Sequence, residues 1–178
     1  VVVAIIGILV AVGVTTFNGF QQKAKVSAVK ANFKNVLKFI NTDAMNCVIS
    51  GGTVFRQSNK SGGGLDRNCS DTSNNGPFSD GELQTHIGYS GIAKNPYGNV
   101  GEDRACDMAK SWGTKSIQSA HLGKKMCNGQ IGLYSETVEQ NGCNREMIVQ
   151  AGLAKDYWTF SNSGSDDVLS AKICIVHK

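Results

Sequence analysis

Proline, aromatic residues and, at one end, charge are scarce in this chain. Only two prolines occur in the 178 residues, and the first of them is Pro77. Nothing in residues 1–48 therefore breaks a helix by removing an amide donor. Residues 1–20, VVVAIIGILVAVGVTTFNGF, contain no charged side chain. A helix of this length and apolarity is able to span the hydrocarbon core of a bilayer, and no later segment resembles it.

Motifs of the common catalytic and metal sites are also missing. The chain has no CxxC pair, no GxSxG and no phosphate-binding loop with the usual glycine spacing. The three histidines stand isolated from any nucleophile: His86, His121 and His177. Asp71, Asp80 and Glu82 lie near one another in the sequence, but their spacing is not that of an EF-hand loop, which favours solvated carboxylates. We therefore expect no catalysis, no cofactor and no metal site.

Six cysteines are present, and all lie outside the apolar stretch. An even number of cysteines behind a hydrophobic N-terminal segment indicates disulfides formed in an oxidising compartment. The sequence alone does not fix their connectivity. We expect sequential pairing, because each resulting loop falls between plausible structural elements. The expected pairs are Cys47–Cys69, Cys106–Cys127 and Cys143–Cys174.

Residues 21–48 have the periodicity of an amphipathic helix that continues the apolar half at 1–20. One apolar stripe recurs at three- and four-residue steps: Val26, Val29, Phe33, Val36, Leu37, Ile40, Ala44 and Cys47. Four lysines flank this stripe: Lys23, Lys30, Lys34 and Lys38. Three alanines form a further strip, which suits either helix propensity or close helix–helix approach: Ala24, Ala28 and Ala31. Around Gly13–Thr16 we expect the helical hydrogen bonds to loosen.

The rest, residues 49–178, is predicted to form a globular head. Turn residues dominate 50–101, so residues 49–126 are expected to be a long loop with little regular structure and short helical turns at 102–112 and 117–122. Strands are predicted at 130–138, 145–151, 157–160 and 171–178. The aromatic residues of 157–160 favour core packing over ligand stacking. The predicted fold class is α+β: a long N-terminal α-helix packed on a small antiparallel β-sheet and stabilised by disulfides.

Residues 2–9, VVAIIGIL, with Val10, Ala11, Val12 and then Phe17 to Phe20, resemble the N-terminal signature of type IV pilins. The likeness covers about residues 1–30, and the head matches only in plan. It implies a type IV pilin-like fold and a precursor from which a peptidase removes a leader and whose new N-terminus is then methylated. The apolar run lacks a basic flank and a cleavage site, so we expect it to stay attached and the natural chain to begin before Val1. Thr15 stands where the family often has a proline.

The resemblance also implies that the subunits polymerise with apolar helices inside and heads outside. The assembly helix would use Val1, Ile5, Ile6, Gly7, Ile8, Leu9, Val12, Gly13, Phe17 and Phe20. Cys143–Cys174 would bound an outward-facing loop. The filament would be an extracellular pilus, with the inner membrane and the assembly machinery as partners of the precursor. It would serve adhesion, motility or DNA uptake, with surfaces or DNA as further partners.

Other functions remain open from the sequence. One is a pseudopilin of a type II secretion system, and another is a monomeric binding module tethered to a membrane. The net charge of +4 is mild and neither requires nor excludes nucleic acid. The lysine flank could attract DNA or anionic lipid headgroups, although a solvated helix face is the simpler interpretation.

Overall fold

A computed structural model describes residues 2–59, 61–73, 76–97, 117–120, 122–140, 142–153, 157–161 and 167–177. Within these ranges, the side chains of residues 9, 11–16, 117–119, 139, 157 and 177 lie outside the description. The fold is α+β, with one long helix, small β-sheets and disulfides.

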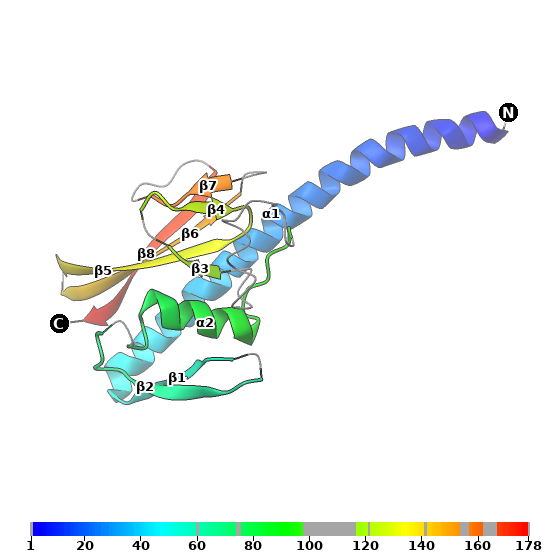
Figure 1. Cartoon of the computed structure of the whole chain (residues 1–178). Coiled ribbons are helices and arrows are strands. Elements are labelled where there is room, and N and C mark those ends of the chain that lie inside the picture. The colour runs from blue at the N-terminus through cyan, green and yellow to red at the C-terminus, as the bar shows by residue number, and fades with distance from the viewer. Residues whose placement is uncertain are drawn as a thin grey trace.

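Helix α1 (Val2–Ser50) is the axis of the molecule. Its 49 residues make a rod about 70 Å long. The N-terminal half projects from the head, and the C-terminal half lies against the sheet (Figure 1). The predicted apolar stripe is the packed face, because Val29, Val36 and Ile40 are fully buried. The helix runs without a break through residues 13–16, where sequence analysis expects loosening.

The main sheet has four strands in the order β3-β5-β6-β8. Their bounds are β3 (Ile117–Ser119), β5 (Ile131–Gln140), β6 (Cys143–Gly152) and β8 (Val168–His177). Strands β5, β6 and β8 are antiparallel neighbours, but β3 pairs parallel with β5. The prediction of a helical turn at 117–122 is therefore wrong. At this edge the sheet is parallel, whereas the sequence predicts an antiparallel sheet. A short apolar run has no periodicity that distinguishes a strand from a helical turn. Residues 117–119 form a strand because they pair with β5.

Strand β6 is buried on both faces. Met147, Val149 and Ala151 belong to the core cluster that includes the α1 stripe. Ile148 points the other way, into a smaller cluster with Trp158 and Phe160. A short pair, β4 (Lys125–Cys127) and β7 (Tyr157–Thr159), carries this second cluster. Trp158 and Phe160 are therefore core residues, in agreement with the core packing that the sequence favours over ligand stacking.

Two elements occupy a region where the sequence predicts little regular structure. Residues 53–68 form a hairpin, β1 (Thr53–Gln57) with β2 (Gly64–Asn68), and α2 (Asp80–Ser90) follows. The prediction of little regular structure is therefore wrong over residues 53–90, and the helical turn predicted at 102–112 lies outside the described residues. Helix α2 has a recognisable start, because Ser79 caps it by accepting from the Glu82 amide, and an end at Gly91 with φ 74°. The hairpin has few apolar residues, so its stability depends on tertiary contacts.

The disulfides Cys47–Cys69 and Cys143–Cys174 are present, with Cα–Cα distances of 5.4 and 5.7 Å. The first joins the end of α1 to the residue after β2, and the second joins β6 to β8. Cys127 is also disulfide-bonded, and its expected partner Cys106 lies outside the described residues. The segment between Cys143 and Cys174 includes the buried strand β6, so it is not the outward-facing loop that the resemblance implies. Most of the described part of this segment belongs to strands β6 and β8 rather than to turns.

Candidate functional site

The candidate site is the uncovered apolar surface of α1, because large exposed apolar side chains gather on this helix. On its N-terminal half they are Val2, Val3, Ile5, Ile6, Ile8, Val10, Phe17 and Phe20. Val3 is 83% exposed, whereas Val29 and Val36 on the same helix are 0% exposed. Burying a large apolar side chain stabilises by about 1.5–3 kcal/mol. An apolar surface of this extent marks an interaction site.

The structure places the predicted assembly residues consistently on this projecting half. Ile5, Ile6, Ile8, Phe17 and Phe20 are exposed. At Gly7, no atom lies within 4 Å of the position that a Cβ would occupy. Val1 and the side chains of Leu9, Val12 and Gly13 lie outside the described residues. The described residues among them are therefore exposed and open to another molecule.

Small side chains line the face of α1 that points away from the head. Ala24 and Ala31 are exposed, and Ala28 is half-buried. At about 100° per residue, Ala24 and Ala31 lie about 120° and 140° around the helix from Val36, the centre of the buried stripe. A second helix could approach this face closely, because the small side chains of Ala24 and Ala31 leave room for its backbone.

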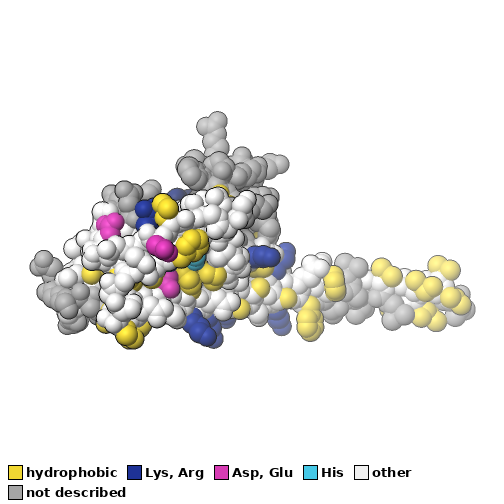
Figure 2. All heavy atoms as spheres, turned by 90° about the horizontal axis from the view of Figure 1, so that it is seen from below, with side chains coloured by type: hydrophobic (Ala, Val, Ile, Leu, Met, Phe, Trp, Pro, Cys, Tyr) yellow, Lys and Arg dark blue, Asp and Glu magenta, His cyan; other side chains and the backbone are white. Residues whose placement is uncertain are grey.

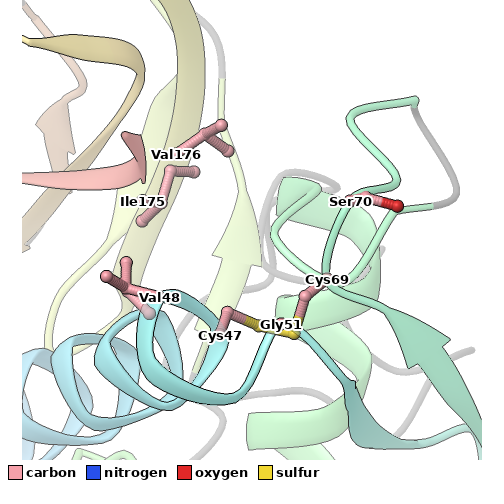
Figure 3. Close-up of a pocket in the computed structure, with 8 residues that line it drawn as sticks. Cys47, Val48, Gly51, Cys69, Ser70, Ile175 and Val176 are labelled. Atoms are coloured by element: carbon pink, nitrogen blue, oxygen red, sulfur yellow. A yellow bond between two sulfur atoms is a disulfide. The ribbon is translucent and has the colours of Figure 1, made fainter. Parts of the chain in front are cut away.

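A second apolar patch lies at the other end of α1. Met45, Val48 and Ile49 are exposed, and Ile49 is 78% exposed. Val48 also lines a groove of about 340 Å³ between α1 and β8, together with Ile175 and Val176 (Figure 3). The Cys47–Cys69 disulfide lies at one side of this groove. Sequence reasoning missed this patch, although apolar residues at 45, 48 and 49 fall at helical spacing outside the main stripe.

The groove has no chemistry of its own. Its lining consists of Ala44, Cys47, Val48, Gly51, Cys69, Ser70, Ile175 and Val176. These side chains include no acid or base, and both cysteines are bonded to each other. The lining of the groove therefore offers no acid or base for catalysis.

A buried cation fixes the hairpin next to this groove. The Arg56 guanidinium donates through Nη1 to Asp43 Oδ2 at 2.6 Å and through Nε to the Pro77 carbonyl at 2.8 Å. It lies 5.7 Å from the Phe39 ring centre and 5.5 Å from that of Phe78. Burial lowers the pKa of Arg56, and Asp43 opposes that shift. Sequence reasoning missed Arg56, because a lone arginine in a short polar strand carries no signal of burial.

His86 lies in the same region. It makes contacts in the structure, although the sequence shows no partner near it. Its Nδ1 accepts a hydrogen bond from the Gln57 amide at 2.8 Å, and its ring stacks on Phe39. Burial lowers the pKa of His86, and the positive charge of Arg56 lowers it further. The histidine is therefore a neutral acceptor that helps to position β1.

The acidic residues that sequence analysis considered for calcium have other contacts. Glu82 forms an ion pair with Arg67 at 2.8 Å, and Asp71 accepts from the Ser73 amide at 2.9 Å. In the described ranges, no three His, Cys, Asp or Glu side chains gather in a way that could hold a metal ion.

The described part of the chain contains no helix whose length and apolarity meet the requirement for crossing a membrane. Compared with protein-family models, curated proteins and solved structures, the chain matches none.

Proposed function

We propose that this chain is the structural subunit of an extracellular type IV pilus, a filament in which the α1 helices of many copies pack together beneath their heads. The observation that carries the proposal is the contrast within one helix. Residues of the same type are fully buried on the C-terminal half and uncovered on the N-terminal half. The proposal includes a type IV pilin-like fold, with the long helix laid on the sheet.

Energetics favours self-association of the projecting half. Eight large apolar side chains there are exposed, and covering them would contribute on the order of 10–20 kcal/mol before the cost of association. At about 100° per residue these side chains spread over about 220° of the circumference of the rod, so one partner cannot cover them all. Several neighbouring copies can, and a contact between unlike surfaces that does not close into a ring produces a helical filament.

The small-residue face supports the same arrangement. Ala24 and Ala31 are exposed on the side of α1 away from the head. Helices that meet there can approach closely, with each head directed outward. Before polymerisation, the proposed partners are the inner membrane and the pilus assembly machinery, because the apolar half then has no neighbouring copy to cover it.

The experiment is negative-stain microscopy of filaments sheared from cells that express the full chain with an assembly system. The wild type should give abundant thin fibres. Ile6→Lys should give none, because a charge would be buried among apolar neighbours. Thr159→Lys adds the same charge at an exposed position of the head and should leave the fibres intact.

Short structures confined to the periplasm would support a pseudopilin instead. Fibres of equal number from Ile6→Lys would overturn the proposed assembly surface. A photo-crosslinking residue at Ala31 tests the remaining alternative, a tethered monomer. A filament gives a ladder of covalent oligomers from that position, whereas a monomer gives a single band.

A further inference from the structure

Arg145 on β6 differs from the other described arginines in its partners. Arg56 forms an ion pair with Asp43 at 2.6 Å, and Arg67 forms one with Glu82 at 2.8 Å. Arg145 is half-buried, and within the described residues no carboxylate forms an ion pair with it. A partly desolvated positive charge whose partners are all neutral lacks compensation, which an anion would supply.

Two neutral acceptors hold the Arg145 guanidinium in place. Its Nη1 donates to the Thr72 carbonyl at 2.6 Å, and its Nη2 donates to Ser135 Oγ at 2.9 Å. A guanidinium has five N–H groups, so these two bonds leave three of them unused. One of the three is Nε, which is buried and has no hydrogen-bond partner in the described part of the chain. The side chain is therefore fixed in position while its hydrogen bonding is incomplete.

Arg145 also lines a pocket of about 350 Å³, together with Thr72, Thr137, Asn144 and Val176. This volume lies at the lower end of the range for ligand sites, so the pocket suits a small molecule. The described residues of the lining carry one positive charge, two hydroxyl groups, one amide and one apolar side chain. None of them is acidic, so the lining favours a ligand that is negatively charged and can exchange hydrogen bonds.

Three irregularities of the main sheet meet at this pocket. The register between β5 and β6 shifts just after Thr137. Asn144 lies opposite no residue of β8, and Ile175 lies opposite no residue of β6. Such bulges recur beside binding and active sites, where they redirect side chains. Here they surround Arg145, so the sheet departs from regular pairing where the pocket lies.

We propose that this pocket binds a small hydroxylated carboxylate, such as a uronic acid. The carboxylate would accept from N–H groups of Arg145 that the protein leaves unused, because a guanidinium recognises a carboxylate through paired, charge-assisted hydrogen bonds. The ligand hydroxyl groups would exchange hydrogen bonds with Thr137 and Asn144. The described lining carries a single positive charge, which matches a monoanion better than a doubly charged phosphate.

The site lies apart from the surface proposed for assembly. Figure 1 shows the neighbouring ends of β5 and β8 at the end of the head away from the projecting half of α1. Figure 2 shows the exposed apolar side chains of that half on the rod outside the head. No described residue of the pocket lining belongs to α1. Ligand binding therefore does not require polymerisation, and the inference does not depend on the proposed function.

The test uses the full chain dispersed in a polyoxyethylene detergent, which has neither a carboxylate nor a sugar group. The readout is the NMR signal of each arginine Nε–H group. The chain has four arginines, and the Arg145 signal is the one that disappears in Arg145→Lys. Titration with D-glucuronate should shift the Arg145 signal and leave that of Arg67 in place, because Arg67 already has a carboxylate partner.

Ligands that carry only part of the proposed chemistry separate the contributions. Acetate has the carboxylate without the hydroxyl groups and should bind about tenfold more weakly than glucuronate. Methyl glucoside has the hydroxyl groups without the charge and should cause no shift. Sodium sulfate at equal ionic strength should also cause no shift of this size, which controls for a general effect of salt.

Matched variants test the lining. Thr137→Val removes one hydroxyl group from an exposed strand position and should lower affinity about fivefold. The control, Thr159→Val, removes a hydroxyl group from an exposed position outside the pocket and should leave affinity unchanged. Arg145→Lys keeps the charge without the planar fork and should lower affinity at least tenfold, followed through the Asn144 amide signal. Near-ultraviolet circular dichroism would confirm that each variant is folded.

An unmoved Arg145 signal in glucuronate would overturn the inference, and so would shifts of equal size in sulfate or methyl glucoside. Equal affinity in Thr137→Val and the wild type would also overturn it, because the lining would then take no part in binding. Glucuronate binding by a chain that forms no filaments in microscopy would remove only the proposed function.

Discussion

Arg56 and Asp43 form an ion pair that joins strand β1 to α1, with 2.6 Å between Nη1 and Oδ2. The Arg56 side chain is 1% exposed and that of Asp43 is 16% exposed. With the Cys47–Cys69 disulfide, this pair holds a hairpin that buries little apolar surface of its own. The hairpin lies beside the groove at the end of α1, so its position controls the shape of that end of the head.

The first prediction concerns this pair. Arg56→Met keeps much of the side-chain volume but leaves a partly buried carboxylate without its partner. Breaking a buried ion pair costs about 3–5 kcal/mol, so the free energy of unfolding should fall by about 3 kcal/mol. Guanidinium unfolding followed by the fluorescence of the buried Trp158 measures it.

Its control is Lys172→Met, which breaks the ion pair with Glu146 at 3.0 Å. Lys172 is 48% exposed, so the loss should stay below about 1 kcal/mol. Equal losses in the two variants would show that burial does not govern the Arg56 pair. Because Asp43→Leu would remove the unpaired carboxylate, the double variant with Arg56→Met should regain part of the stability.

The second prediction concerns the Cys47–Cys69 disulfide. Replacing both cysteines by serine releases a bridge with a sequence separation of 22. The chain-entropy model gives a loss of about 3 kcal/mol in the free energy of unfolding. Hydrogen exchange should accelerate first in β1 and β2, because polar contacts such as Arg56–Asp43 and Arg67–Glu82 then hold the hairpin without a covalent link. Unchanged protection in β1 and β2 would contradict this assignment.

The third prediction concerns pH. The pKa of His86 lies below its ordinary 6.5, first because of burial and then because of Arg56. The unfolded chain therefore binds a proton more readily than the folded chain. The stability from neutral His86 is complete above pH 6.5 and is lost as the pH falls through the lowered folded-state pKa. Protonation would also replace the acceptor lone pair that the Gln57 amide uses.

Thermal unfolding between pH 7.5 and 5 would measure this effect. The decline in melting temperature should be shallower in His86→Gln, which keeps a polar side chain that does not titrate. An NMR titration of the His86 ring protons should report a midpoint below 6.5. A midpoint above 6.5 would reverse the predicted sign.

The fourth prediction concerns Gly152. A Cβ there would collide with the indole ring of Trp158, which is buried in the second cluster. Gly152→Ala should lower the free energy of unfolding by about 1–3 kcal/mol through overpacking. Gly81→Ala is the control, because no atom lies within 4 Å of its Cβ position in α2. That variant should be neutral or gain up to about 1 kcal/mol.

Several features of the fold follow from periodicity and are visible in the sequence. The stripe containing Val29 and Val36 predicts the buried face of α1, and the alternation of Ile173 and Ile175 predicts the inward face of β8. Helix α2 could have been found too, because Ser79 and Glu82 have the spacing of a helix start and Gly91 marks its end. The hairpin and strand β3 have no comparable local signal, since partners distant in the sequence stabilise them.

The sequence by itself determined that α1 has an uncharged half and an amphipathic half, because side-chain type and helical period are local properties. The sequence also shows that this uncharged half consists largely of apolar residues, whose exposure to water is unfavourable. Only the tertiary structure decided that Arg56 is buried, that His86 is an acceptor and that Val48 lines a groove. Burial depends on which distant elements pack over a residue, and no local pattern encodes that choice.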